Sequence, residues 1–231
     1  MIFTRVKQAF VLFGQEMKYN RLKQNNKIRN FDKCEVKIMV KAAIVFSDGC
    51  EEVEGLSQVD VLRRLDIPCD MIGLTSKTIR GGHGIVFECD KTLDDSLLDY
   101  DLVSFPGGAP NAHHLRDSVK LGELIAERHR QGKWDAAMCA SPIALSKYGL
   151  LENANWTSHP DFKAQVQSEN PSSHYMDTPV VVDAEHKLIT SRGPATSWAF
   201  AYAIARVLGK DTEDLENAMQ YNYLRDHINL D

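Results

Sequence analysis

The cysteine at position 139 stands where a reactive thiol is expected. Residues 136–138 (AAM) form a short apolar strand, and Pro142 suits the first turn of a helix that follows. A thiol at such a helix start faces unpaired backbone N–H groups and the positive end of the helix dipole, and both favour the thiolate. The segment therefore predicts a nucleophile at Cys139 with a lowered pKa. The alternative is a buried structural cysteine, the ordinary state of a free cysteine.

A second candidate is the acidic run 51–54 (EEVE), which opens the first predicted helix. Acids are common there because they complement the helix dipole, and this explains most such runs. The helix follows the first strand, however, so it begins beside the ends of the other strands, and one of its carboxyls can reach Cys139. An ionised carboxylate would repel a thiolate, whereas a protonated carboxyl donates a hydrogen bond to sulfur. We therefore expect a carboxyl with a raised pKa beside Cys139.

Histidine 159 is the candidate for proton transfer, because the run 157–160 (TSHP) places it at a predicted strand-to-helix junction. Cys–His pairs are often distant in sequence and adjacent in the fold. The chain has eight histidines, so a surface location is the ordinary alternative. His83, His113, His114 and His174 show no metal-ligand spacing, and we expect neither a metal site nor a cofactor.

Two turns complete the candidate site. The run 106–108 (PGG) offers backbone N–H groups unhindered by side chains, which suit an oxyanion pocket, although Pro-Gly-Gly is also an ordinary turn. Arg192, in the run 191–194 (SRGP), either binds an anion or holds loops together by hydrogen bonds. We favour the structural role for Arg192.

Strands alternating with helices position these segments. Apolar runs of strand length occupy residues 40–46, 69–74, 102–105 and 136–138. Helical patterns cover residues 51–65, 119–130, 142–148, 194–208 and 212–223. Irregular extended structure is predicted for 79–87, and a hairpin for 179–182 with 188–190. The alternation predicts an α/β fold with a mainly parallel sheet between helices, and the segments 48–54, 106–108 and 139–142 fall at strand ends, where such sheets bind ligands.

Composition and charge limit the function classes. The 231 residues, 43% hydrophobic and 26% charged, are typical of a globular chain. A net charge of -5 argues against a general nucleic-acid binder, and no segment reaches the roughly 20 apolar residues of a membrane span. The five cysteines are odd in number and lack CxxC spacing, so we expect reduced thiols and a cytoplasmic location. The expected partners are small molecules or protein.

The first 38 residues differ from the rest of the chain. They carry nine Lys/Arg and three acids, or +6, which leaves -11 for the remainder, and Met39 directly precedes the first strand. We expect a basic N-terminal extension over residues 1–38, either a flexible appendage or a translation start placed too early, and a single domain over 39–231. A transit peptide is a weaker alternative, because the segment has no serine.

Taken in order, these segments resemble the ThiJ/PfpI superfamily and, within it, the branch of the parkinsonism-associated protein deglycase. The match runs from about Val40 to Tyr223. It rests on the runs 51–54 (EEVE), 59–64 (VDVLRR), 106–108 (PGG), 137–140 (AMCA), 157–160 (TSHP) and 190–194 (TSRGP). The resemblance implies a flavodoxin-like three-layer sandwich and a homodimer.

The same resemblance implies roles for individual residues. Cys139 is the expected oxidisable nucleophile, Glu54 the protonated carboxyl beside it, and His159 the nearby histidine. Gly108 and Ala140 are the expected backbone N–H donors. Glu51 and Arg64 are the pair expected near the dimer interface.

Two departures from the family pattern bear on function. The peptidase and amidotransferase branches place His directly after the nucleophile, where this chain has Ala140, so a peptidase or amidase is disfavoured. Ser141 replaces the Gly or Ala usual in this branch, and a hydroxyl close to the thiol can alter its hydrogen bonding.

The implied activity is that of a cysteine-dependent, glutathione-independent glyoxalase or protein deglycase. Its substrates would be reactive dicarbonyls or their glycated adducts. An alternative of a different class is a redox-sensing, chaperone-like stress protein in which Cys139 is oxidised to sulfenic or sulfinic acid. A role linked to thiamine biosynthesis rests on the family name alone, and peptide hydrolysis is weaker still.

Overall fold

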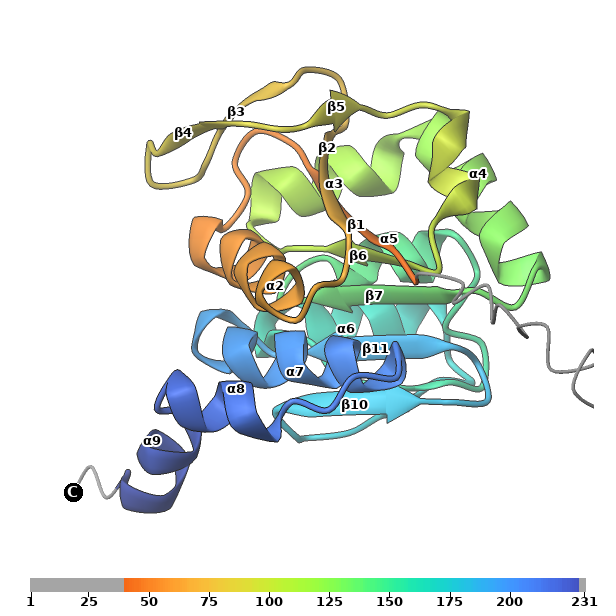
Figure 1. Ribbon diagram of the computed structural model, residues 1–231. Helices are drawn as coiled ribbons and strands as arrows, with labels where there is room; N and C mark the ends of the chain where they lie inside the picture. Colours follow the sequence, from red (N-terminus) through yellow and green to blue (C-terminus); the bar gives the residue numbers. More distant parts are fainter. Residues whose placement is uncertain (1–39, 229–231) are drawn as a thin grey trace, which may run out of the picture. The chain divides into compact units, whose positions relative to one another are not determined.

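A computed structural model describes residues 40–228 of the chain (Figure 1). The predicted N-terminal extension, residues 1–38, lies outside the described residues. A seven-stranded sheet in the order β10-β11-β7-β6-β1-β2-β5 forms the centre of the described part. Its strands are β1 (Ala42–Phe46), β2 (Cys69–Gly73), β5 (Lys91–Thr92), β6 (Leu102–Phe105), β7 (Trp134–Met138), β10 (Val180–Asp183) and β11 (Leu188–Ser191).

The neighbouring strands are parallel, with the exception of the β10–β11 hairpin at one edge. Each residue of β1 is buried, which fits its continuous apolar sequence, because a strand covered on both faces needs apolar side chains on both. The predicted mainly parallel sheet and the hairpin are confirmed.

Helices cover both faces of the sheet, as predicted (Figure 1). One face carries α3 (Ala109–Asp117), α4 (Val119–Arg130), α5 (Pro142–Lys147) and α6 (Pro160–Glu169). The other carries α2 (Glu52–Arg64) and α7 (Ser197–Val207). Side chains of β1 alternate between the two cores, with Val45 in the first and Ile44 in the second. Within residues 40–228, no helix is both long and apolar enough to cross a lipid bilayer.

Two predicted elements differ from the structure. Residues 79–87 were expected to be irregular, but β3 (Thr78–Arg80) and β4 (Val86–Glu88) pair as an antiparallel ribbon. Phe87 packs the ribbon against β1, because the centroids of its ring and the Phe46 ring lie 5.2 Å apart. The single helix predicted over 212–223 is interrupted by Gln220, at φ 61°, and becomes α8 (Glu213–Ala218) and α9 (Tyr221–His227).

Several short elements have no counterpart in the predictions. The helix predicted from residue 194 begins with the 3-10 turn η2 (Pro194–Thr196), and another such turn is η1 (Asp95–Asp99). The pair β8 (Asn155–Trp156) and β9 (His174–Tyr175) precedes and follows α6. Helix α3 was not predicted, because it buries few apolar residues, and α6 was predicted only as the helix start after His159, because it buries Val166 alone.

Candidate active site

Cys139 lies in the turn between β7 and α5. Its φ of 59° is a left-handed conformation that few residues other than glycine adopt. Two backbone hydrogen bonds of 2.9 Å hold it there: the Cys139 N–H donates to the Ser191 carbonyl, and the Cys139 carbonyl accepts from the His159 N–H. Neighbouring segments thus fix a strained turn that presents a partly exposed thiol at the carboxyl end of the sheet.

Glu54, in the first turn of α2, lies beside this thiol and is fully buried. Its Oε2 accepts a hydrogen bond of 2.6 Å from the Gly107 N–H, and its carboxyl lies next to the Cys139 side chain. Burial raises the pKa of Glu54 to about 7, although the contacts with Gly107 and Cys139 act to lower it. The structure therefore places a carboxyl with a raised pKa next to Cys139.

The pKa of the Cys139 thiol is raised, whereas the sequence predicted a lowered pKa. Burial raises the pKa of Cys139 to about 12, and the charge of Glu54 adds to this increase. The N–H groups of Gly108 and Ala140 point at the sulfur and lower its pKa, so the predicted helix-start effect is present but outweighed. Because carboxylate and thiolate repel each other here, the two groups do not both ionise near neutral pH, and protonation of Glu54 favours the thiolate.

Gly107 lies where the two side chains meet. A methyl group added to Gly107 would lie 2.5 Å from Cβ of Cys139 and 2.6 Å from Oε2 of Glu54. Gly108 has a φ of 88°, and a methyl group there would lie 2.2 Å from the Gly49 carbonyl oxygen. Both positions therefore require glycine, which explains the Pro-Gly-Gly turn at the end of β6.

His159 is brought to Cys139 through its backbone. The residue caps α6, and its Nδ1 accepts a hydrogen bond of 3.3 Å from the Asp161 N–H. Its side chain is 41% exposed, and Nδ1 also lies 3.5 Å from the Asp161 carboxylate. The predicted junction is confirmed, because His159 directly precedes α6, which begins at Pro160.

Ser141 and Arg192 both turn away from the thiol. The Ser141 hydroxyl donates a bond of 2.5 Å to the Pro106 carbonyl, so it braces the glycine turn. Arg192 forms an ion pair with Asp177 and lies 3.4 Å from the Tyr175 hydroxyl, contacts that match the structural role favoured from the sequence.

The acidic run has further partners that the sequence did not indicate. Both oxygens of buried Glu52 accept bonds of 2.8 Å from His83, one from its backbone N–H and one from its ring. Glu51, Glu52 and His83 hold ligand atoms within 4.8 Å of one another, as a metal site requires, but the carboxylate of Glu52 is already satisfied by His83. Arg64 pairs with Asp60 on the same helix at 2.9 Å.

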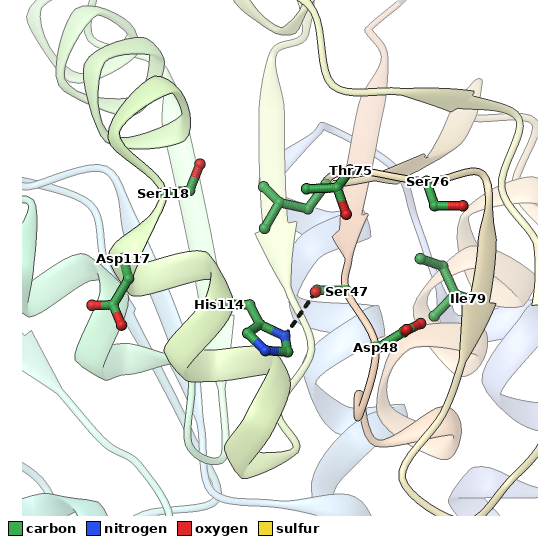
Figure 2. A pocket seen from close by; sticks show the side chains of 9 residues that line it. Ser47, Asp48, Thr75, Ser76, Ile79, His114, Asp117 and Ser118 are labelled. Carbon is green, nitrogen blue, oxygen red and sulfur yellow. Dashed lines mark hydrogen bonds between the residues drawn. The ribbon is translucent and has the colours of Figure 1, made fainter.

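A cavity of about 430 Å³ lies beside the site, between the end of β1, the turn after β2 and the α3–α4 junction (Figure 2). Its lining residues are Ser47, Asp48, Leu74, Thr75, Ser76, Ile79, His114, Asp117 and Ser118. The hydroxyl of Ser47 is 2.9 Å from Nδ1 of His114 (Figure 2). Neither Cys139 nor Glu54 lines this cavity, so it is separate from the thiol.

Comparison with known proteins gives one consistent result. Residues 40–207 match the model of the DJ-1/PfpI family. The chain is 33% identical over 199 residues to Protein DJ-1alpha of Drosophila melanogaster, which covers 84% of this chain and 88% of the relative. It is 27% identical over 184 residues to the glutathione-independent glyoxalase DJ-1 of Schizosaccharomyces pombe, covering 75% of this chain and 94% of that protein.

A solved structure agrees with these sequence matches. The crystal structure of Drosophila melanogaster DJ-1beta superposes with a TM-score of 0.72 at 32% identity, and covers 78% of this chain and 98% of that structure. The flavodoxin-like arrangement of sheet and helices is thus shared with a solved relative. Together with the family match over most of the described residues, this shows that the chain belongs to the DJ-1/PfpI family.

Proposed function

We propose that this protein is a glutathione-independent glyoxalase, with deglycase activity on glycated adducts as an extension of the same chemistry, and that Cys139 is its nucleophile. The observation that carries the proposal is the Cys139–Glu54 pair, in which a partly exposed thiol and a buried carboxyl with a raised pKa lie together beside the glycine turn. The relative from Schizosaccharomyces pombe, whose name states this activity, supports the choice of reaction.

The first step forms a covalent adduct. The Cys139 thiolate adds to the aldehyde carbon of methylglyoxal, and the resulting oxyanion is held by the N–H groups of Gly108 and Ala140 and then protonated. The product of this step is a hemithioacetal. Glu54, whose pKa of about 7 leaves its carboxyl partly protonated at neutral pH, is the group placed to supply it.

The second step is an internal redox reaction. A base, Glu54 or His159, removes the proton from the former aldehyde carbon and delivers it to the neighbouring carbonyl carbon through an enediol. The first carbon is thereby oxidised to a thioester, and the second is reduced to an alcohol. Water then cleaves the carbon–sulfur bond and releases lactate and the thiol. The overall reaction converts methylglyoxal and water to lactate, so these steps need no external oxidant or reductant.

The test is lactate formation from methylglyoxal by purified protein without glutathione. Wild type should produce lactate in proportion to the methylglyoxal consumed, and Cys139→Ala should not. Cys69→Ala is the matched control, because Cys69 is a buried cysteine in β2. Equal turnover by wild type and Cys139→Ala would contradict the proposal.

A second candidate function, redox sensing, is favoured by the exposure of the cysteines. Cys50, Cys69 and Cys89 are buried, whereas Cys139 is partly exposed. Among these four cysteines of the described residues, peroxide should therefore reach Cys139 first and oxidise it to sulfenic and then sulfinic acid. Peptide mass spectrometry after mild peroxide treatment measures this selectivity, and oxidation spread evenly over all cysteines would count against a sensor at Cys139.

A further inference from the structure

We propose that Asn111, assisted by Ser141, is a positioning residue for the thiol: it fixes two successive peptide groups so that their N–H groups point at Glu54 and Cys139. The inference depends on the proposed function only in taking Cys139 as the reacting group. Asn111 lies in α3, outside the acidic run 51–54, the segment 136–142 around Cys139 and the glycine turn 106–108.

The argument starts from the planarity of the peptide bond. In a trans peptide group the C=O of one residue and the N–H of the next point in opposite directions and turn together. The Pro106 carbonyl therefore controls the Gly107 N–H, which donates to Oε2 of Glu54 at 2.6 Å. The Gly107 carbonyl likewise controls the Gly108 N–H, which points at the Cys139 sulfur.

The side-chain amide of Asn111 holds both carbonyls at once. Its Nδ2 donates to the Pro106 carbonyl at 2.7 Å and to the Gly107 carbonyl at 3.2 Å. Its Oδ1 accepts a bond of 2.7 Å from the Ser47 N–H, so the amide is itself fixed by the end of β1. All three hydrogen bonds of the Asn111 side chain are made to backbone groups, and this side chain is fully buried.

Two further bonds secure the same carbonyls. The buried Ser141 hydroxyl donates to the Pro106 carbonyl at 2.5 Å, and the Glu51 N–H donates to the Gly107 carbonyl at 3.0 Å. Glycines have no side chain to hold a turn in place, and Gly108 occupies a left-handed conformation. The Gly107 and Gly108 N–H groups therefore owe their direction to Asn111 and Ser141, together with the Glu51 N–H, and the hydroxyl that departs from the family pattern has a structural purpose.

The experiment measures alkylation of Cys139 by iodoacetamide over a pH series, with the Cys139 peptide quantified by mass spectrometry. Asn111→Ser and Ser141→Ala are compared with wild type. Asn170→Ser is the control, because Asn170 is also a buried asparagine, and its Nδ2 donates to Ser146 away from the glycine turn. Circular dichroism and thermal melting confirm folding of each variant.

We expect the alkylation rate at neutral pH to fall about tenfold in Asn111→Ser and about threefold in Ser141→Ala, because misdirected N–H groups stabilise the thiolate less. The pH midpoint of alkylation should rise in the same order, and Asn170→Ser should keep the wild-type midpoint. A purely structural role would lower the melting temperature and leave the midpoint unchanged.

A folded Asn111→Ser protein with the wild-type rate and midpoint would overturn the proposal. If Asn111→Ser does not fold, Ser141→Ala decides alone, and an unchanged midpoint in it overturns the proposal equally. Alkylation needs no turnover, so this outcome is separate from that of the glyoxalase test. Absence of lactate together with a raised midpoint would reject the proposed reaction and support the positioning role.

Discussion

Burial and like charge act in the same direction at Cys139 and Glu54, because both disfavour ionisation. Burial raises the pKa of both groups, and the negative charge of either one disfavours the charge of the other. Backbone N–H groups from the glycine turn and from Ala140 oppose these effects. The result is a carboxyl that titrates near neutral pH beside a thiol, and such a carboxyl can donate a proton in one step and accept one in the next.

The raised pKa of Glu54 has a consequence for stability. The pKa is about 7 in the folded protein and 4.5 as an ordinary glutamate, so the folded state holds the proton over a pH range where the unfolded state has released it. Wild type should therefore lose stability as pH rises from 4.5 to about 7, by on the order of 3 kcal/mol. Glu54→Gln removes this dependence, so its unfolding free energy should increase relative to that of wild type as pH rises over the same range.

Urea unfolding at a series of pH values measures the effect. Asp60→Asn is the control for a changed acid on α2, because its half-exposed side chain faces away from the thiol pair and bonds Arg64. A difference in unfolding free energy between wild type and Glu54→Gln that stays constant with pH would contradict the assignment of Glu54 as the group that holds the proton.

At this scale the sequence identifies the reacting groups better than their state. A cysteine between an apolar strand and a proline-led helix is a local pattern, and so is an acidic helix start. The pKa of Cys139 depends on how completely distant segments bury it, which no local pattern contains. Asn111 was not predicted for the same reason, because its partners Ser47 and Pro106 follow the ends of two strands, β1 and β6.

At the scale of elements, Arg128 joins α4 to β7 and to η1. Its guanidinium bonds the Asp135 carboxylate at 2.9 Å and the carbonyls of Leu97, Tyr100 and Trp134 at 3.0, 2.6 and 2.7 Å. Arg128 and Asp135 are both fully buried. Burial raises the pKa of Asp135 to about 6, against the lowering by the Arg128 charge. One side chain thus satisfies four acceptors in the core.

Arg128→Met should therefore destabilise the protein by about 3–5 kcal/mol, because it leaves a buried carboxylate and three carbonyls without a partner. Arg130→Met is the matched control on the same helix. Arg130 pairs with Glu127 at an exposed position, and its replacement should cost less than about 1 kcal/mol. Chemical denaturation of both variants measures the difference, and similar losses would show that the buried pair has no special role.

Elements with a strong hydrophobic period were predictable, whereas those fixed by packing were not. The strands β1, β6 and β7 and the helices α2 and α4 follow apolar patterns in the chain. Helix α6 buries Val166 alone, so it lacks such a pattern. The break between α8 and α9 depends on the left-handed backbone conformation of Gln220. Glutamine has no preference for this conformation, so the sequence does not predict it.

For the whole molecule, we expect a homodimer formed through α2. Val53 on α2 is 54% exposed, so an apolar side chain is available there for contact with a second copy. It lies between Glu51 and Arg64, the pair that the family resemblance places near a dimer interface. The family fold was recognisable from the order of its motifs, but an interface between copies depends on surface shape, which the order of motifs does not contain.

Val53→Arg should convert the dimer to a monomer in sedimentation equilibrium, because it places a charge in an apolar contact. Val119→Arg is the control, since Val119 is 75% exposed at the start of α4, on the other face of the sheet. A monomeric wild type, or a Val53→Arg protein that stays dimeric, would contradict the assignment of α2 to the interface.

The central claim is that Cys139 and Glu54 act as one catalytic unit. The most direct measurement is kcat/KM for lactate formation from methylglyoxal, without glutathione, in wild type, Cys139→Ala and Glu54→Gln. The account predicts turnover in wild type, none above background in Cys139→Ala, and a loss of about 100-fold or more in Glu54→Gln, which keeps the shape of the carboxyl but cannot transfer its proton. Wild-type kcat/KM in Glu54→Gln would contradict it.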